Sequence, residues 1–184
     1  MSQATDRIEA LWSALPPAPT DTGTVVQVCV RPELDQRAFP ALLELCPRRG
    51  AIGDRWVRRT WRHLPDGSPD PRVQVAVASA RMMTFLQRLA GVRHHPGDTL
   101  IVDLDLSAGN LPVGARLRVG TAVIEVSDIE NDGCAKFARH YGEDVLAWIR
   151  APENRERRLR GLFARVVAAG RVAAGDAVEV LARS

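Results

Sequence analysis

Cys134 is the residue of this sequence best placed to do chemistry. A polar turn from Asp128 to Gly133 precedes it, and an apolar pattern of helical period follows it. At the first turn of a helix, unpaired backbone N–H groups and the helix dipole favour the thiolate, which is the nucleophilic and metal-binding form of cysteine. Free cysteines also serve as small buried apolar residues, so the position of Cys134 alone leaves a structural role open.

Positive charge is a second chemical signal, and nearly all of it is arginine, because Lys136 is the only lysine. Two segments concentrate the arginines: Arg48, Arg49, Arg55, Arg58, Arg59 and Arg62 in one, and Arg155, Arg157, Arg158 and Arg160 in the other. Guanidinium groups suit bidentate binding of phosphate, although such runs also occur as solvated faces. Arg55 and Arg160 lie near glycines that permit close approach, so we expect them to hold an anionic ligand. Helical geometry predicts that Lys136 points away from Cys134.

The elements that must position Cys134 are a strand before it and one or two helices after it. Residues 121–127 alternate in polarity, which predicts a half-buried strand with Ala122, Ile124 and Val126 on one face. The helical stripe consists of Cys134, Phe137, Tyr141, Val145 and Trp148. Cys134 is therefore expected where a strand hands over to a helix.

Short strands separated by glycine turns are predicted through the rest of the chain, at 24–31, 73–77, 99–103, 116–119, 161–168 and 177–181. In the first of them, Val26, Val28 and Val30 are expected on one face, and Val25 and Cys29 on the other. The stretch from Gly97 to Asp128 is typical of a β-meander. This pattern favours a barrel or a sandwich, mainly β with peripheral helices, in a single domain.

Three further segments have weaker or helical patterns. Residues 5–15 predict an amphipathic helix, followed by prolines, that packs on the barrel surface or against a partner. We therefore divide the chain into a helix and proline-rich connector at 1–22 and a barrel domain at 23–184. Residues 82–90 predict a helix with Met83, Leu86 and Ala90 facing inward. The stretch 39–45 is compatible with a helical turn or a short strand.

Composition limits the classes of function. The 184 residues are 46% hydrophobic and 26% charged, with a net charge of +3, which does not favour a nucleic-acid binder. No apolar run is long enough to span a membrane and no signal-peptide pattern is present, so a cytoplasmic protein is expected. Three scattered cysteines argue against a disulfide framework. Adjacent His94 and His95 lack further ligands, so no metal site built from protein ligands alone is predicted.

Four motifs in order resemble the MOSC domain, which is related to the C-terminal part of molybdenum-cofactor sulfurases. They are GAIGDRW at 50–56, HPGDTLIVD at 95–103, DGCAKFARHYG at 132–142, and RLRGLFARVVAAGRVAAGDAVEV at 158–180. The resemblance spans roughly residues 24–181. Two departures are visible. Threonine replaces the asparagine of the family's G-x-N-L at Thr99, and Asn131, Asp132 and Gly133 precede the cysteine, whereas many relatives carry an arginine or a proline just before it.

The resemblance implies a MOSC-type barrel and a site built around Cys134, as the catalytic residue or as a ligand of molybdenum. It also implies a set of cofactor-binding residues: Gly53, Asp54, Arg55, Asp98, Thr99, Arg160 and Gly161. The implied cofactor is molybdopterin, an anionic pterin, and the implied activity is reduction of N-hydroxylated substrates or sulfur transfer. A redox or sulfur-donor partner protein would then be needed, with no nucleic acid or membrane involved. The alternative is a non-catalytic binding module on the same barrel.

Overall fold

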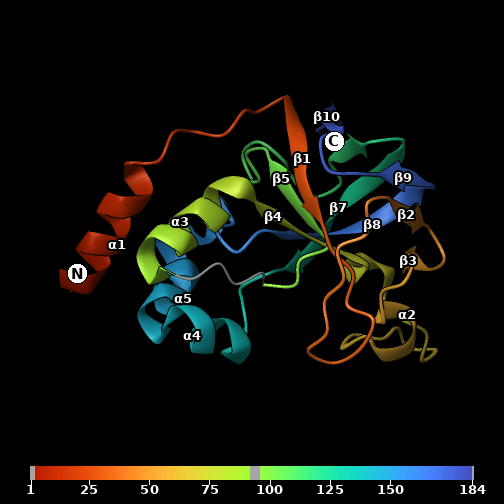
Figure 1. Cartoon of the computed structure of the whole chain (residues 1–184), viewed down its shortest axis with the longest axis horizontal. Helices are drawn as coiled ribbons and strands as arrows, with labels where there is room; N and C mark the ends of the chain where they lie inside the picture. The colour runs from red at the N-terminus through yellow and green to blue at the C-terminus, as the bar shows by residue number, and fades with distance from the viewer. Residues whose placement is uncertain (1–2, 92–95, 184) are drawn as a thin grey trace.

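A closed β-barrel forms the centre of the structure, a computed structural model that describes residues 3–91 and 96–183 (Figure 1). Its seven strands are β1 (Thr22–Val28), β4 (Val75–Ser79), β5 (Leu100–Asp103), β6 (Arg116–Val119), β7 (Ala122–Glu130), β8 (Leu162–Ala168) and β10 (Ala177–Ala182). They close in the order β1, β10, β6, β7, β8, β4, β5, and only β4 and β5 run parallel. The predicted barrel with peripheral helices is confirmed.

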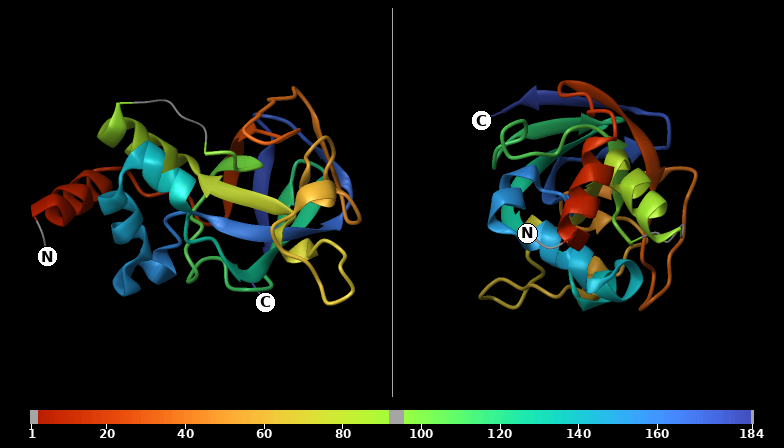
Figure 2. Two further views of the ribbon diagram at one scale, coloured as in Figure 1. Left: turned by 90° about the horizontal axis from the view of Figure 1, so that it is seen from below. Right: turned by 90° about the vertical axis from the view of Figure 1, so that its left-hand side faces the viewer.

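A layer of helices covers one end of the barrel: α1 (Gln3–Ser13), α3 (Ala80–Ala90), α4 (Ala135–Tyr141) and α5 (Glu143–Arg150). Figure 2 shows this layer and the barrel arranged along the long axis of the molecule. The layer has its own core, in which the ring of Phe85 lies 5.7 Å from that of Trp12 and 5.2 Å from that of Trp148. Helix α1 therefore packs against α3 and α5, and not on the barrel surface.

A small sheet lies at the opposite end, with its strands in the order β3, β2, β9. These strands are β3 (Gly50–Ala51), β2 (Leu43–Cys46) and β9 (Gly170–Val172). The stretch 39–45, whose sequence was compatible with a helical turn or a short strand, thus contains most of strand β2. A short helix, α2 (Trp56–Arg59), follows β3, and two 3-10 turns, η1 (Pro71–Val73) and η2 (Pro152–Arg157), complete the elements.

Strand β1 corrects the predicted faces. Val25 and Val28 are buried, whereas Val26 is 50% exposed, because the register shifts between Val25 and Gln27. A bulge adds one residue to the strand, and one residue is enough to exchange the two faces beyond it. Cys29 is buried, as expected for a core position. The pairing of β7 with β8 also shifts register, between Val123 and Ile124, but the extra residue lies in β8. Strand β7 therefore keeps its alternation, and the predicted buried face of Ala122, Ile124 and Val126 is confirmed.

The predicted β-meander from Gly97 to Asp128 is wrong in its first step. Strand β5 pairs with β1 and β4, while β6 pairs with β7 and β10. The chain between β5 and β6 is held by the N-terminal connector: the Asp105 amide donates to the Pro19 carbonyl at 2.8 Å, and Asn110 Nδ2 to the Thr20 carbonyl at 2.9 Å. In the closed barrel, β1 and β10 therefore lie between β5 and β6, although β5 and β6 follow one another in sequence.

Helix α3 also departs from its predicted face. It buries Met82, Phe85 and Leu86, so the stripe is displaced from the predicted set of Met83, Leu86 and Ala90. His94 and His95 lie outside the described residues. Among the helices that the structure describes, none has the length and apolar character required to cross a lipid bilayer.

Asp70 is a fully buried carboxylate that ties the segment before β4 to the barrel. It accepts hydrogen bonds from Arg72 at 2.7 Å, from the Arg72 backbone N–H at 3.0 Å and from Arg62 at 2.9 Å. Arg72 in turn contacts Asp128 in β7 at 3.1 Å. The hydrogen bonds from Arg72 are the main reason that the pKa of Asp70 is lowered to about 2.

Replacing Asp70 with asparagine should therefore destabilise the protein in a pH-dependent way. The folded-state pKa lies below the unfolded value of about 3.9, so this contribution is complete above about pH 4 and is lost as pH falls through about 2. We expect Asp70→Asn to lower the free energy of unfolding by about 2–3 kcal/mol at pH 7, and by clearly less at pH 3. Urea denaturation at both pH values measures this. Asp103→Asn, which removes an exposed carboxylate, is the control. An equal loss at both pH values would contradict the prediction.

Candidate functional site

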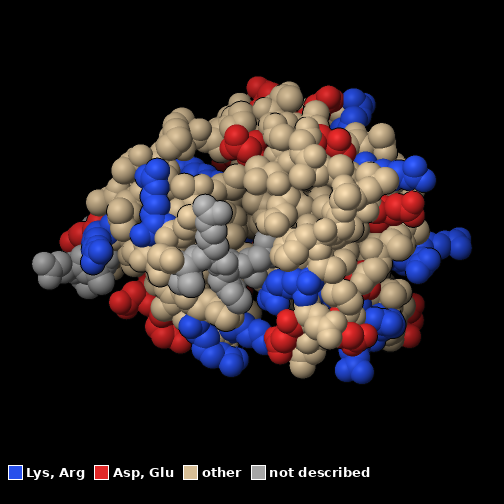
Figure 3. Space-filling model, in the orientation of Figure 1, with Lys and Arg blue, Asp and Glu red and all other residues tan. Residues whose placement is uncertain are grey.

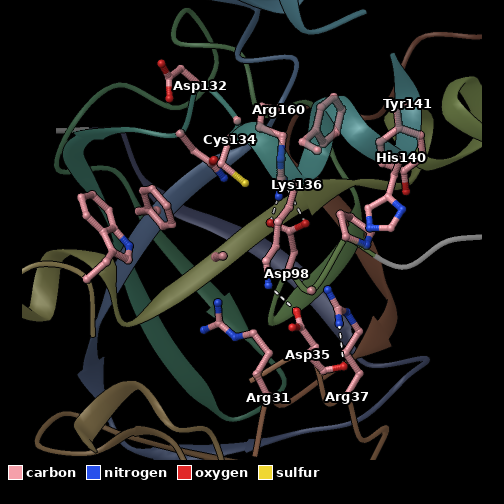
Figure 4. A pocket seen from close by; sticks show the side chains of 18 of the residues that line it. Arg31, Asp35, Arg37, Asp98, Asp132, Cys134, Lys136, His140, Tyr141 and Arg160 are labelled. Carbon is pink, nitrogen blue, oxygen red and sulfur yellow. Dashed lines mark hydrogen bonds and ion pairs between the residues drawn. The ribbon is translucent and has the colours of Figure 1, made fainter. Parts of the chain in front are cut away.

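A cavity of about 400 Å³ opens beside the barrel, between the loop after β1, the turn after β7 and helix α4. Its lining includes Cys134, Arg160, Arg31, Arg37, Arg55, Asp98, Lys136, Trp61, Phe163 and Tyr141. Figure 4 shows these groups converging from opposite walls, and Figure 3 shows charges of both signs interspersed on the surface in the view of Figure 1. Segments far apart in sequence thus meet around one cysteine.

Cys134 is positioned by the turn that joins β7 to α4. It is the residue before the first helical residue, with extended backbone angles of φ −142° and ψ 173°, and it is exposed. Gly133 has a φ of +84°, which favours glycine, and a Cβ on it would lie 2.8 Å from Leu146 Cδ1, so a larger residue would also displace this side chain of α5. Figure 4 shows the Cys134 sulfur directed toward Arg160 and Asp98. Cys134 is therefore not part of the buried stripe of α4.

Arg160 and Asp98 form a nearly buried ion pair next to the cysteine. Arg160 Nη1 donates to both oxygens of Asp98, at 2.8 and 2.9 Å, and the two side chains are 12% and 1% exposed. The Arg160 guanidinium also lies 5.4 Å from the Phe137 ring centroid. Its Nε is buried and has no hydrogen-bond partner among the described residues. This ion pair holds the start of strand β8 against the segment that precedes strand β5.

Arg31 is held in the cavity wall by Asp54. The Arg31 guanidinium donates to Asp54 at 2.9 and 3.2 Å, and the Asp54 side chain is only 1% exposed. Asp54 also accepts the backbone N–H groups of Arg31 and Trp56, both at 2.8 Å. Asp54 therefore orients an arginine and starts α2, and it does not itself line the cavity. The resemblance implied instead that Asp54 binds the cofactor.

Lys136 lines the same cavity as Cys134, which corrects the expectation that it points away. The expectation assumed helical geometry at both residues, but Cys134 is extended and only Ala135 begins the helix. The ammonium group of Lys136 pairs with Asp35, a residue on the opposite loop. This contact crosses the cavity from the cysteine side to the β1 side (Figure 4).

The pairing of charges leaves two arginines of the cavity lining without a carboxylate partner among the described residues. Every described carboxylate of its lining has a basic partner: Asp35 with Lys136, Asp98 with Arg160, Glu33 with Arg58, Glu130 with Arg155, and Asp132 with Arg150. Arg37 and Arg55 form no ion pair within the described part of the chain, and Arg37 Nε is buried without a hydrogen-bond partner there. Two arginines therefore remain available to an anion.

Asp132 has less influence than its place in sequence indicates. Its carboxylate lies 3.3 Å from Arg150 Nε, and Arg150 also donates to the carbonyls of Asp132 and Gly133 at 3.1 and 3.0 Å. Figure 4 shows the carboxylate turned away from the Cys134 sulfur. Its negative charge is thus offset by an arginine outside the cavity.

A family model for the MOSC domain matches residues 71–179, which is more than half of the chain. The protein belongs to the MOSC domain family. MOSC domains are associated with binding of the molybdenum cofactor. The match does not include the GAIGDRW segment at 50–56. No curated protein sequence matches the chain at a significant level.

Solved structures resemble this MOSC domain in fold. YiiM from Escherichia coli is 20% identical, with a TM-score of 0.60, over 88% of this chain and 71% of YiiM. The YuaD protein from Bacillus subtilis is 19% identical, with a TM-score of 0.59, over 86% of this chain and 95% of YuaD. A further crystal structure, of a hypothetical protein, is 21% identical, with a TM-score of 0.62, over 89% of this chain and 70% of that one.

The site residues implied by the resemblance fall into two groups in this MOSC domain. Cys134, Arg55, Asp98 and Arg160 line the cavity together, whereas Gly53, Asp54, Thr99 and Gly161 do not. Thr99 is buried, and its hydroxyl accepts the Ala76 backbone N–H at 3.3 Å. Gly161 lies in a second, more open cavity of about 830 Å³, on the other side of the segment 130–132.

Several cavity residues were not found by sequence reasoning, namely Arg31, Arg37, Lys136, Phe163 and Tyr141. Arg31 and Arg37 flank a proline-containing loop outside the two arginine-rich segments, so the clustering of arginines in the sequence did not point to them. Trp61 also lines the cavity; it is 65% exposed, and its ring centroid lies 6.0 Å from that of Phe163. Within residues 3–91 and 96–183, no cluster of His, Cys, Asp and Glu could hold a metal ion by itself.

Proposed function

We propose that this MOSC domain binds the molybdenum cofactor, or a related phosphate-bearing pterin, in the 400 Å³ cavity, with Cys134 as its thiolate ligand or as a sulfur carrier. The supporting observation is that an exposed cysteine opens into the same cavity as Arg37 and Arg55, which lack carboxylate partners among the described residues. A thiolate is a soft ligand suited to such a metal, and guanidinium groups suit a phosphate.

The residues of the chain fit this group in separate roles. Arg37 and Arg55 would bind the phosphate, and the buried Nε of Arg37 is a donor that still needs an acceptor. The Asp98–Arg160 pair would keep the wall beside Cys134 rigid. Burial raises the pKa of Tyr141 to about 12, so its phenol stays protonated at neutral pH. When bound, the cofactor would supply redox chemistry, and reduction of N-hydroxylated substrates with a partner protein as electron donor is the proposed activity.

The test is metal and pterin analysis of protein purified from a host that makes the cofactor, combined with calorimetry of a phosphate-bearing pterin. Arg55→Gln should weaken pterin binding by about tenfold and reduce its dependence on salt, because one direct charge contact is lost. Arg160→Ala is unsuitable, since it would leave Asp98 buried without its partner and destabilise the fold. Arg59→Gln is the matched control, because Arg59 lies in the same segment, is exposed and does not line the cavity.

Two outcomes would contradict the proposal. Equal pterin affinity in wild type and Arg55→Gln would exclude the arginine from the site. Protein that retains neither molybdenum nor pterin, and that fails to bind added phosphopterin, would favour a non-catalytic binding module on the same barrel.

A further inference from the structure

Asp35 is an acidic residue placed among bases. Its carboxylate pairs with Lys136, and its backbone carbonyl lies 3.5 Å from Arg37 Nη1. Lys136 first, then Arg37 and Arg55, hold the pKa of Asp35 below its usual value. Figure 4 shows Asp35 between Arg31 and Arg37, with Lys136 extending toward it from the side of Cys134. These basic side chains at the open end of the cavity thus surround a carboxylate of the protein itself.

The loop that carries Asp35 is held at its base by the paired backbone hydrogen bonds of Val30 and Ala38, and Asp35 lies on its exposed part. Asp35 has a φ of +60°, in the left-handed region that non-glycine residues rarely adopt, and its side chain is 66% exposed. The Lys136 contact joins residues 101 positions apart across the cavity. A single exposed ion pair contributes little free energy, so a competing anion can break it.

We propose that Lys136, Arg37 and Arg55 form an oxyanion-binding subsite at the cavity mouth, and that Asp35 occupies it until the phosphate of a ligand displaces it. Displacement exchanges an internal carboxylate for an external phosphate on the same bases. The inference rests on the proposed function for the identity of the ligand, but the subsite itself can be examined with inorganic phosphate.

Glu33 offers a matched comparison for Asp35. Both carboxylates lie on the same loop and line the cavity, and their side chains are 52% and 66% exposed. Glu33 pairs with Arg58, which does not line the cavity, whereas Asp35 pairs with Lys136, which does. Glu33→Gln and Asp35→Asn each remove one negative charge, but only the second vacates the subsite.

The experiment is calorimetric titration of inorganic phosphate into cofactor-free wild type, Asp35→Asn, Glu33→Gln, Lys136→Gln and the double variant Asp35→Asn/Lys136→Gln. Asp35→Asn should bind phosphate about two- to fivefold more tightly, the range expected for releasing an exposed ion pair. Lys136→Gln should bind more weakly than wild type, and the double variant should lose the gain. Glu33→Gln should show less than half of the gain of Asp35→Asn. Thermal melting checks that all variants are folded.

Unchanged or weaker phosphate binding by Asp35→Asn would overturn the inference, and so would an equal gain in Glu33→Gln, which would indicate a general field effect. A repeat on cofactor-loaded protein identifies the source of the anion: lost phosphate binding assigns the subsite to the phosphate of the cofactor, and retained binding assigns it to an anionic substrate. If the phosphate results fail while molybdenum is retained, only this inference falls. If no molybdenum is retained but Asp35→Asn shows the gain, the subsite stands without the proposed function.

Discussion

Replacing Cys134 with serine should abolish molybdenum retention and remove the fastest site of iodoacetamide labelling in the folded protein. The hydroxyl of serine is neither a soft ligand nor a nucleophile at neutral pH. Cys134 is exposed and lies outside the buried stripe of α4, so the change should move the melting temperature by less than about 2 °C. The labelling is measured by peptide mass analysis after alkylation at about pH 7.5. This pH lies roughly one unit below the pKa of a free thiol.

The other two cysteines are internal controls for this prediction. Burial raises the pKa of Cys29 to about 11, so it should stay unlabelled in the folded protein. Cys46 lies half-buried in β2, outside the cavity lining, and Cys46→Ser should retain molybdenum. If Cys134 is labelled only after unfolding, or if Cys134→Ser retains molybdenum, the assignment of the reactive residue is wrong.

Replacing Gly161 with alanine should prevent stable folding, at a cost of at least about 3 kcal/mol. Gly161 has a φ of +101°, and a Cβ at this position would lie 2.0 Å from the carbonyl oxygen of Val77 in β4. The contact is between two backbones at the start of β8, so no side chain can move aside to relieve it. Urea denaturation followed by circular dichroism measures the loss.

Gly175 separates the two causes of that loss. Its φ of +94° is similar, but a Cβ there would meet nothing within 4 Å. Gly175→Ala should therefore cost only the backbone strain, about 1 kcal/mol. If Gly161→Ala is no more destabilising than Gly175→Ala, the close approach to Val77 is not the reason that residue 161 is a glycine. A role of Gly161 in ligand binding in the neighbouring cavity then becomes the better explanation.

The barrel was predictable from the sequence because its strands carry local signals. The alternation of β7 and the change to a helical period after Gly133 place Cys134 at a strand-to-helix turn, and the structure confirms that place. Pairing partners and bulges were not predictable. Nothing local in the sequence shows that β5 lies beside β1 and β4, or that β1 shifts register after Val25. These features depend on contacts between distant segments.

The site divides in the same way. The motif and the clustering of arginines were enough to predict Cys134 and Arg160 as site residues, but they do not show which residues form ion pairs with one another. Asp54 was expected to face a ligand, and it instead holds Arg31, because the fold brings the end of β1 beside the turn before α2. Lys136 was rejected on helical geometry that does not apply one residue before the helix begins. The role of a charged residue can be assigned only when the residue that it pairs with in the fold is known.

Barrel closure depends on strands from the two ends of the described chain. β1 pairs with β10, with Thr22 opposite Glu179, so one edge of β1 has no permanent partner until the last strand has been synthesised. On the ribosome, where residues are added at about 5–20 per second, that edge waits about 8–30 seconds until β10 has been synthesised. An unpaired strand edge can join strands of other chains, so aggregation should compete with folding during this interval. A nascent chain that stops before β10 should consequently require a chaperone to stay dispersed.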